Sequence, residues 1–320
     1  MNRKILAKNS TQTDKVAIAA SVLTAAKKDN VFFDLPIGEK TTYRAGGSAA
    51  IFFRIDELDD LYVLSHALWQ SSLEVMCLGK GSNTLVSEKG FSGICCALSD
   101  QFSYIETDKN DLTLTCGAAA SLPQIARQSA AAGLSGMEWA VGIPGSCGGA
   151  VLMNAGGHGS DTATVVGRMD VFDLAGGQLV TYQRDEVAFS YRHSSFSGRE
   201  ILLEAVFNLV PGDAQRSLVE IQEIVSWRRQ HQPGGKNAGS VFKNPQGVSV
   251  GKLLDELGLK GFRHRSACVS DKHANFFQLD TGGRSDDVLE LIEIVREKVV
   301  RETGIVLEPE VKLVGFENLQ

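Results

Sequence analysis

Hydrophobic positions recur at helical spacing in several stretches of the chain. Leu58, Leu61, Leu64 and Leu68 stand three or four residues apart, so they would share one face of a helix. We therefore predict a helix over 56–69 with Asp56 as its N-cap. The same reasoning predicts helices over 15–28, 123–132, 214–229 and 286–300, with Pro123 in a first turn and Gly133 as a C-cap.

Runs rich in β-branched and aromatic residues predict strands between these helices. The run 74–78 is mostly apolar, so we expect a buried strand that leads into a turn at 79–83. Gly176 and Gly177 are typical of a hairpin turn between 169–174 and 178–182. Further strands are predicted over 49–54, 94–98, 112–116, 201–210 and 311–316. The pattern predicts an α+β chain with a boundary at 211–213, where Pro, Gly and Asp follow one another.

Length and charge narrow the class of protein. The chain has 320 residues, of which 43% are hydrophobic and 22% charged, as is ordinary for a globular protein. The length favours two domains, because single cores rarely grow beyond about 250–300 residues. The formal net charge of −6 gives no support for a nucleic-acid partner. An anionic small molecule would need only a few local cations and stays possible.

The cysteines and the N-terminal stretch add little chemistry. None of the cysteines forms a C-x-x-C pair or a zinc-type grouping with histidine, which predicts reduced thiols and no metal site. The apolar stretch 16–26 fits both a signal-peptide core and an amphipathic helix. No run reaches the roughly 18 apolar residues that a membrane span requires. The cysteines are Cys77, Cys95, Cys96, Cys116, Cys147 and Cys268.

Glycines gather in two places, and the first, residues 79–85, follows a predicted strand. We call it the first glycine cluster. Glycines there let backbone N–H groups approach an anion, and serine and asparagine supply further donors. The segment matches neither a dinucleotide G-x-G-x-x-G motif nor a Walker A loop. By itself a tight turn explains it as well as a phosphate cradle. Its candidate cofactor-binding residues are Gly79, Gly81, Ser82, Asn83 and Thr84.

The second glycine cluster, residues 142–157, holds six glycines and one proline. We expect it to form neither a conventional helix nor a conventional strand. A convoluted structural loop is one explanation, and a backbone that lies close to a flat or charged ligand is the other. Together the two clusters favour a dinucleotide with a pyrophosphate and an aromatic ring. Its candidate cofactor-binding residues are Gly142, Ile143, Pro144, Gly145, Ser146, Gly149, Ala150 and Asn154.

Several motifs along the chain resemble those of a known protein family. The segments 42–49, 79–83 and 142–156 resemble, in order, the FAD-binding segments of the UDP-N-acetylenolpyruvoylglucosamine reductases, and Arg44 joins the candidate cofactor-binding residues on this ground. The match continues through 189–194, 238–245, 258–261, 269–276 and 308–311, and it spans roughly 36–316. About 47 residues separate Arg192 from Ser240, which resembles the class without the family's extra tyrosine loop.

The resemblance implies a fold, a reaction and a location. The fold would be a two-lobed FAD-binding domain of the vanillyl-alcohol-oxidase type over 29–211, after an N-terminal extension over 1–28. A smaller α+β substrate domain would occupy 212–320. NADPH would reduce non-covalently bound FAD, which would pass a hydride to the enolpyruvyl group of UDP-N-acetylglucosamine enolpyruvate and give UDP-N-acetylmuramate. Such peptidoglycan precursors are made in the cytoplasm, and the family implies no membrane, nucleic-acid or obligate protein partner.

The resemblance also implies roles for single residues. Ser240 matches the proton donor, and Arg192 and Glu310 match the residues that polarise the substrate carboxylate. Without their motifs, these three would be interpreted as a turn serine, a surface ion pair and a strand-edge carboxylate. The candidate substrate-binding residues are Tyr191, Arg228, His231, Lys243, Asn244 and Asn275.

A few positions depart from the family pattern, and two rival functions remain. His231 stands where many relatives have lysine, His158 replaces a tyrosine, and Arg265–Ser266 replaces a small glycine-rich pair. These departures leave the substrate contacts open. One rival is an alcohol oxidase on the same FAD scaffold, although no histidine occurs over 75–95, where many of those enzymes carry one. The other is a catalytically silent flavin- or nucleotide-binding protein, which retention of Arg192, Ser240 and Glu310 disfavours.

Overall fold

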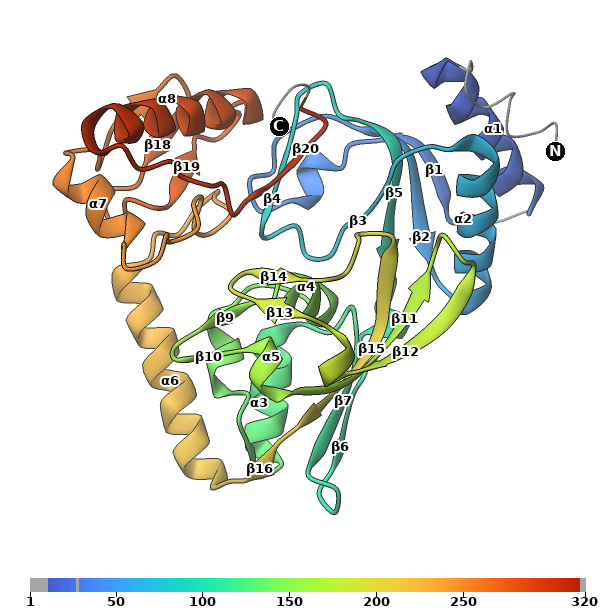
Figure 1. The fold of residues 1–320 in the computed structure, drawn as a ribbon, viewed down its shortest axis with the longest axis horizontal. Helices are drawn as coiled ribbons and strands as arrows, with labels where there is room; N and C mark the ends of the chain where they lie inside the picture. The colour runs from blue at the N-terminus through green and yellow to red at the C-terminus, as the bar shows by residue number, and fades with distance from the viewer. Residues whose placement is uncertain (1–10, 27–28, 317–320) are drawn as a thin grey trace. The chain divides into compact units, whose positions relative to one another are not determined.

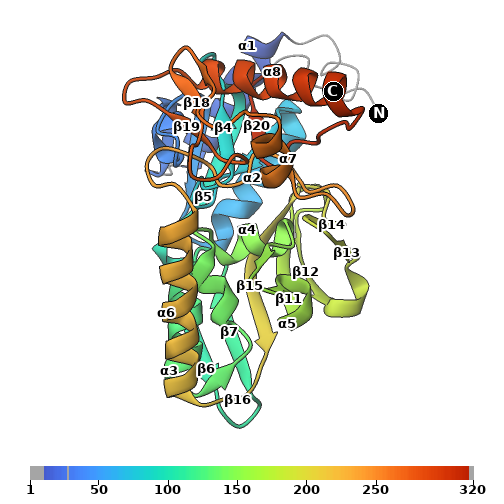
Figure 2. The same ribbon diagram turned by 90° about the vertical axis from the view of Figure 1, so that its left-hand side faces the viewer.

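The computed structural model describes residues 11–26 and 29–316, and these residues divide into two compact units. The first unit contains residues up to 35 together with 49–79 and 92–225. The second contains 36–48, 80–91 and the chain from 226 onward. Helices and strands are mixed in both, as the α+β prediction expects (Figures 1 and 2).

One part of the first unit is a sheet with the strand order β1-β2-β5-β3, covered by α1 and α2. The strands are β1 (Val31–Leu35), β2 (Ala49–Ile55), β5 (Phe91–Leu98) and β3 (Val75–Cys77), and the helices are α1 (Gln12–Ala25) and α2 (Leu58–Ser71). Ala19 and Leu23 of α1 are fully buried with Leu61 and Leu64 of α2, and Figure 1 shows the two helices side by side. Residues 12–25 are therefore an integral part of this unit.

The other part of the first unit is an antiparallel sheet with the order β12-β11-β15-β7-β6. Gly176 and Gly177 lie in the predicted hairpin turn, whose connection runs over 174–177, because Asp173 of β11 faces Gln178 of β12. The apolar core contains side chains from α3, α4 and the start of α6. The elements are β6 (Ile105–Asp108), β7 (Thr113–Gly117), β11 (Val166–Asp173), β12 (Gln178–Gln183), β15 (Glu200–Asn208), α3 (Leu122–Ala131), α4 (Cys147–Leu152) and α6 (Ala214–His231).

Short elements complete the first unit. Three two-residue ladders pair β9 (Gly156–Gly157) with β10 (Ser160–Asp161), β13 (Phe189–Ser190) with β14 (His193–Ser194), and β16 (Val210–Pro211) with β8 (Leu134–Ser135). One α-helical turn and three 3₁₀ helices connect them within the described residues: α5 (Thr162–Val165), η3 (Asp100–Phe102), η4 (Glu138–Gly142) and η5 (Arg184–Glu186).

The second unit packs α8 across an antiparallel sheet of β17, β18 and β19, as both ribbon views show (Figures 1 and 2). A parallel pair joins β4 to β20, although 227 residues of chain separate their first paired positions, Thr84 and Lys312. Its core includes Tyr43 and Leu85 beside residues of the C-terminal segment. The elements are η2 (Gly38–Lys40), β4 (Thr84–Val86), α7 (Val250–Glu256), β17 (Arg263–His264), β18 (Ala267–Val269), β19 (Phe277–Leu279), α8 (Ser285–Thr303) and β20 (Lys312–Val314).

All the predicted helices and strands are found, with shifts at their ends, and three details were wrong. The N-cap of α2 is Glu57, because the Asp60 carboxylate accepts hydrogen bonds from the N–H groups of Asp56 and Glu57 and holds Asp56 outside the helix. The strand over 74–78 is not buried: β3 is at the sheet edge, and Cys77 is exposed. The C-cap of α3 is Ala132, with Gly133 following in the left-handed conformation.

The second glycine cluster also departs from expectation, because it contains the short helix α4. Ser146 is the N-cap, and its Oγ accepts a hydrogen bond from the Gly149 N–H at 3.3 Å. Cys147, Ala150 and Val151 are buried in the core of the five-strand sheet. Burial of these apolar residues offsets the low helix propensity of the two glycines within the helix.

The two units do not coincide with the segments 29–211 and 212–320. Residues 36–48 and 80–91 belong to the same unit as the C-terminal segment. The boundary between the first unit and that segment falls inside α6, between Val225 and Ser226. The reason is the pairing of β4 with β20 and the burial of Tyr43 in the C-terminal core. Within 11–26 and 29–316, every helix is too short or too polar to cross a membrane.

Candidate functional site

In the second unit, the motif that contains Arg44 is held backbone to backbone against the first glycine cluster. The Thr42 N–H donates to the Gly81 carbonyl at 3.1 Å. A Cβ on Gly81 would lie 2.6 Å from the Lys40 carbonyl oxygen and 2.7 Å from Thr41 Cα, and its φ is +63°. Only glycine fits such an approach without displacing the neighbouring backbone. Arg44 itself has a φ of +51°.

In the first unit, the beginning of the first glycine cluster packs against the second. A Cβ on Gly79 would lie 2.6 Å from the Ser146 Oγ, which also caps α4. Pro144 and Gly149 are exposed on either side of Ser146, and Gly79 is exposed as well. Exposed glycine backbone fits a flat or charged ligand at close range. The remaining candidates, Gly142, Ile143, Gly145 and Ala150, lie along the same segment.

Asn154 is placed differently from the other cofactor candidates. Its side chain is 97% buried, since its exposed fraction is 3%, and its φ is +41°. The amide Nδ2 donates to the Ser190 carbonyl at 2.9 Å and to the Asp161 carboxylate at 3.3 Å, and Oδ1 accepts from the Ala163 N–H at 2.9 Å. Asn154 therefore connects three segments of the protein.

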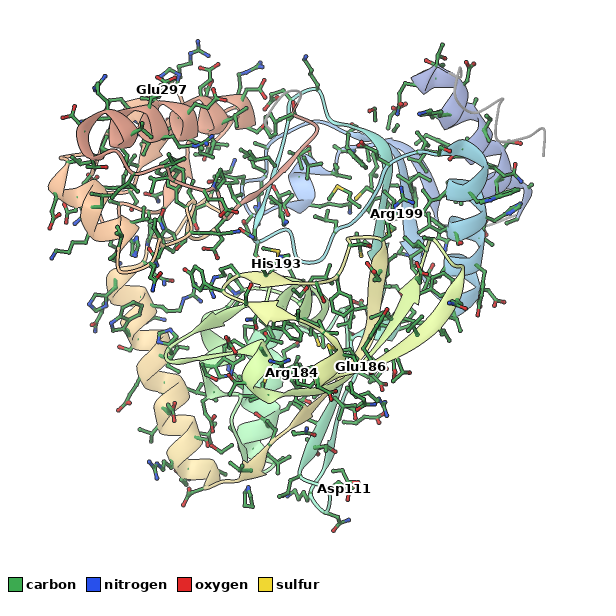
Figure 3. All side chains as sticks on the ribbon, viewed as in Figure 1. Asp111, Arg184, Glu186, His193, Arg199 and Glu297 are labelled. Atoms are coloured by element: carbon green, nitrogen blue, oxygen red, sulfur yellow. The ribbon has the colours of Figure 1, made fainter. Side chains whose placement is uncertain are left out.

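Arg192 lies at the tip of a small hairpin. Ser190 of β13 faces His193 of β14, so Tyr191 and Arg192 form the two-residue loop, next to His193 as labelled in Figure 3. Ser194 is buried, and its Oγ donates to the Leu152 carbonyl at 2.7 Å, which anchors the hairpin on the end of α4.

Two contacts orient the guanidinium of Arg192. Its Nη2 donates to the Gly156 carbonyl at 2.9 Å, and its Cζ lies 5.0 Å from the centre of the exposed Tyr191 ring. Arg192 has a φ of +56°. Left-handed backbone at a residue other than glycine costs about 1 kcal/mol or more and occurs often at functional sites. Arg44, Asn154 and Arg192 all share it.

Ser240 and Glu310 lie on adjacent segments of the second unit. Ser240 pairs with Phe276 in an antiparallel bridge, and the Val241 N–H donates to the Asn275 carbonyl at 2.8 Å. On the other side, the Glu310 N–H donates to the Val241 carbonyl at 2.7 Å. The segment 240–243 is therefore held between 275–276 and 308–310. Ser240 and Glu310 are both partly exposed.

Asn275 supports this arrangement from inside. Its exposed fraction is 2%, its Nδ2 donates to the Phe242 carbonyl at 2.8 Å, and its Oδ1 accepts from the Phe242 N–H at 3.0 Å. Both ends of the amide are therefore bonded to one buried backbone unit. This geometry gives Asn275 a structural role in placing the Ser240 segment.

Asn83 connects the first glycine cluster to Glu310. Its Nδ2 donates to the Glu310 carbonyl at 3.0 Å, and its own carbonyl accepts from the Lys312 N–H at 2.9 Å. These bonds continue the parallel pairing of β4 and β20. The cofactor candidates Ser82, Asn83 and Thr84 thus lie beside the segment that carries Glu310.

The other substrate candidates have partners within the protein. Lys243 forms an ion pair with Glu308, and the Asn244 Oδ1 accepts from the Val250 N–H at 2.9 Å at the start of α7. Arg228 and His231 lie in the last turn of α6, where cations are favoured by the helix carbonyls. Burial lowers the pKa of Arg228.

His231 and Arg228 are fixed by local contacts. The Arg228 Nε donates to the Gln232 Oε1 at 2.7 Å. The His231 ring stacks on Trp227 with centroids 4.6 Å apart, and its Nδ1 lies 2.8 Å from the Trp227 carbonyl. These contacts leave the two side chains in a defined orientation at the helix end.

Sequence reasoning missed three residues that build the site. Tyr43 is fully buried, donates from its hydroxyl to the Phe277 carbonyl at 3.1 Å, and has a pKa that burial raises. Asp161 caps α5 and binds Asn154, and Ser194 anchors the Arg192 hairpin. Tyr43 and Ser194 stand inside matched motifs, so their motif positions were a usable signal; Asp161 before Thr162 carried only an N-cap signal.

Comparisons with known proteins show which family the chain belongs to. Residues 49–183 match the family described as an FAD binding domain. Residues 230–314 match the family described as UDP-N-acetylenolpyruvoylglucosamine reductase, C-terminal domain. A UDP-N-acetylenolpyruvoylglucosamine reductase from Synechococcus is 39% identical over 294 residues, covering 89% of this chain and 93% of the relative. The chain belongs to this reductase family.

Further relatives extend the comparison to structure. The Heliobacterium modesticaldum reductase is 39% identical over 88% of this chain and 89% of its own length. The crystal structure of UDP-N-acetylenolpyruvylglucosamine reductase from Thermus caldophilus superposes with a TM-score of 0.76 at 32% identity, covering 88% of this chain and 97% of that one. The predicted family and the predicted fold, an FAD-binding domain followed by the family's C-terminal domain, are therefore confirmed.

Proposed function

We propose that this chain reduces the enolpyruvyl group of UDP-N-acetylglucosamine enolpyruvate to UDP-N-acetylmuramate, with non-covalent FAD as cofactor and NADPH as hydride donor. Membership of the reductase family supports the reaction class. The observation that carries the proposal is the backbone bond between Glu310 and Val241, which places the family's carboxylate and the Ser240 segment side by side. This activity makes the chain an oxidoreductase of peptidoglycan precursor synthesis.

The cofactor has a fitting site in the glycine clusters. In the second unit, Gly81, Ser82 and Thr84 would hold FAD together with Arg44, whose loop Thr42 fixes to Gly81. In the first unit, the contact between Gly79 and Ser146, the partly exposed Gly145 and the exposed Gly149 would accept it. When bound, FAD supplies a hydride to the terminal alkene carbon of the substrate. Asn83 and Asn154 position these segments through their bonds to Glu310 and Ser190.

The chain's own residues handle the charge that hydride arrival creates. Negative charge develops on the carbon next to the substrate carboxylate, and the Ser240 hydroxyl donates a proton to that carbon. Arg192 offers a planar pair of N–H donors to the carboxylate, and Glu310 polarises the same group. Because its hairpin is anchored by Ser194, Arg192 makes this contact with little loss of conformational freedom.

Weaker roles fall to the remaining candidates. We assign Tyr191, Lys243 and Asn244 to substrate contacts, because Tyr191 and Asn244 are exposed and Lys243 follows Ser240 closely. Arg228 and His231 are assigned to the substrate diphosphate. The segments 29–211 and 212–320 are proposed as the cofactor and substrate domains. We place the reaction in the cytoplasm, where precursors of this kind are made, without an obligate protein, nucleic-acid or membrane partner.

The test is a two-step assay of Ser240→Ala. The flavin of the variant should still be bleached by NADPH, because that step does not use the Ser240 proton. Its reoxidation by the enolpyruvyl UDP-sugar should slow by about 10²–10⁴-fold, the range typical of a lost general acid. Stopped-flow absorbance of the flavin measures both steps. Ser21→Ala, on the exposed side of α1, is the matched control and should behave as the parent protein.

Three results would contradict the proposal. Unimpaired reoxidation in Ser240→Ala would remove that residue from the mechanism. Reduction of the flavin by a simple alcohol would favour an alcohol oxidase. A purified chain that binds no flavin, or whose flavin turns over with none of these substrates, would favour a silent binding protein.

A further inference from the structure

We propose that Cys77 and Cys96 form a redox-active thiol pair beside the first glycine cluster, in which hydrogen peroxide oxidises Cys77 and Cys96 closes a reversible disulfide. Both residues belong to the first unit and are free cysteines. The pair is independent of the proposed reaction, since it rests on the neighbouring strands β3 and β5 alone.

The strand pairing brings the two thiols together. Cys77 and Cys96 are direct register partners in the parallel pair of β3 and β5, and the Leu78 N–H donates to the Cys96 carbonyl at 2.8 Å beside them. Neighbouring strands lie about 4.8 Å apart, which is within the 4.4–6.8 Å Cα separation that disulfides span. The Cys96 thiol points toward β3, because its Sγ lies 3.4 Å from the Met76 carbonyl.

The adjacent Cys95 is not the partner. Successive side chains of a strand point to opposite faces, so Cys95 and Cys96 lie on different faces of the sheet. Cys95 pairs in register with Met76, and its Sγ contacts the Cys96 carbonyl at 4.0 Å. Only Cys96 therefore shares the face and the register position of Cys77.

The two thiols differ in solvent exposure and in pKa, and these differences determine the order in which they react. Cys77 is exposed at the sheet edge and Cys96 is fully buried. A hydrogen bond between the two thiols lowers the pKa of Cys77, and the same bond, with burial, raises the pKa of Cys96. The thiolate is the nucleophile in such chemistry, so Cys77 reacts first and Cys96 second.

The chemistry balances with peroxide as the oxidant. The Cys77 thiolate attacks one peroxide oxygen, an S–O bond forms, the O–O bond breaks, and hydroxide leaves and is protonated to water. Cys96 then loses its proton and attacks the Cys77 sulfur, the S–S bond forms, the S–O bond breaks, and a second water leaves. Two thiols are oxidised by two electrons in total, and one peroxide is reduced to two waters.

The position of the pair indicates what disulfide formation does for the protein. Cys77 precedes Gly79 by two residues and is exposed at the start of the first glycine cluster. A lone exposed thiolate would proceed to sulfinic and sulfonic acids, which are not reversed by thiols. Disulfide closure by Cys96 stops that progression and keeps the segment recoverable.

The experiment treats the purified flavin-containing full chain with hydrogen peroxide and maps its cysteines by peptide mass spectrometry. We expect a Cys77–Cys96 disulfide that dithiothreitol reverses. In Cys96→Ser, a sulfenic acid at Cys77 should be trapped by dimedone, and longer exposure should give at least about tenfold more irreversible oxidation at Cys77 than in the parent. Cys96→Ala replaces this variant if the serine disturbs the core.

The matched control is Cys268, which is partly exposed on β18 and faces Arg263 and Gln278 in register. It has no thiol partner in its two register positions, so its oxidation should be no less reversible in Cys96→Ser than in the parent. Peroxide treatment that oxidises Cys268 while Cys77 and Cys96 both stay alkylatable would overturn the proposal. A disulfide from Cys77 to a different cysteine would overturn it as well.

Discussion

Backbone conformation at individual residues decides much of this site. Arg44, Asn154 and Arg192 adopt positive φ, and Gly81 combines a positive φ with close backbone contact on its Cα side. Tertiary contacts hold the segments that carry them, such as the bond from Arg192 Nη2 to the Gly156 carbonyl. Conformations of this kind cost free energy, so they persist only where surrounding structure fixes them.

Gly81→Ala separates steric contact from backbone strain. The new Cβ would meet the Lys40 carbonyl at 2.6 Å, so we expect a loss of more than about 3 kcal/mol in unfolding free energy and weakened flavin retention. The control Gly247→Ala has a similar φ of +74° but open space around the Cβ. It should lose only about 1–2 kcal/mol. Urea unfolding and flavin fluorescence measure both, and equal losses would refute the steric argument.

Between elements, buried polar groups join segments that the apolar core alone would not align. Glu138 of η4 is an example, with an exposed fraction of 5%. Its Oε1 accepts from Ser135 Oγ at 2.7 Å and from Ser217 Oγ of α6 at 2.6 Å, and its Oε2 accepts from the Gly136 N–H at 2.8 Å. One carboxylate therefore fixes the start of α6 against η4.

The stability of Glu138→Gln, compared with the parent across pH, should reveal this role. Burial favours the neutral form, but the hydrogen bonds from Ser217, Ser135 and Gly136 outweigh it and hold the pKa of Glu138 below its usual 4.5. Its contribution to stability is therefore complete above the usual pKa and is lost as pH falls through the lowered one. We expect Glu138→Gln to cost about 1–3 kcal/mol near neutral pH, with a smaller difference from the parent in acid.

Glu220, one turn along α6 from Ser217, provides a control because its pKa shift has the opposite sign to that of Glu138. Burial, followed by the charge of Glu138, raises its pKa. A raised carboxyl pKa favours folding below the usual pKa and opposes it above, so Glu220→Gln should slightly stabilise the protein near neutral pH. Urea unfolding across the acid range tests both variants. A Glu138→Gln deficit that is independent of pH would contradict the assignment.

At the scale of the whole molecule, the two units are interleaved in sequence. The second unit recruits 36–48 and 80–91 to the chain from 226 onward. Tyr43 and Leu85 are fully buried in its core, and Glu88 Oε1 accepts from the Ser285 N–H at 2.8 Å at the start of α8. A cut at 211 therefore removes parts of the second unit that the C-terminal segment cannot replace.

The fragment 212–320 should consequently not fold cooperatively by itself. It lacks β4, the partner of β20, together with Tyr43 and the cap from Glu88. We expect circular dichroism to show a broad, weakly cooperative thermal transition, in contrast to the full chain. Co-expression with 1–211 should restore a sharp transition if the missing segments are the cause. A sharp transition of the isolated fragment would refute the interleaving as a requirement for folding.

The sequence by itself determined what depends on neighbours along the chain. Helices with regular apolar spacing, the hairpin at Gly176–Gly177 and the ordered motifs that identify the reductase family were all predictable, because periodicity, turn chemistry and motif order are local. Those motifs singled out Ser240, Arg192 and Glu310 as candidate catalytic residues, and the roles of these residues remain a proposal.

Tertiary structure alone decided which residues meet. Asn275 closes both its bonds on Phe242, and Asn83 reaches the Glu310 carbonyl across 227 positions. Cys77 finds Cys96 through the register of β3 and β5. These partners are set by how distant segments pack, and a residue's sequence neighbours carry no record of that packing. The short helix α4 in a glycine-rich stretch has the same origin, since burial in the core outweighs local propensity there.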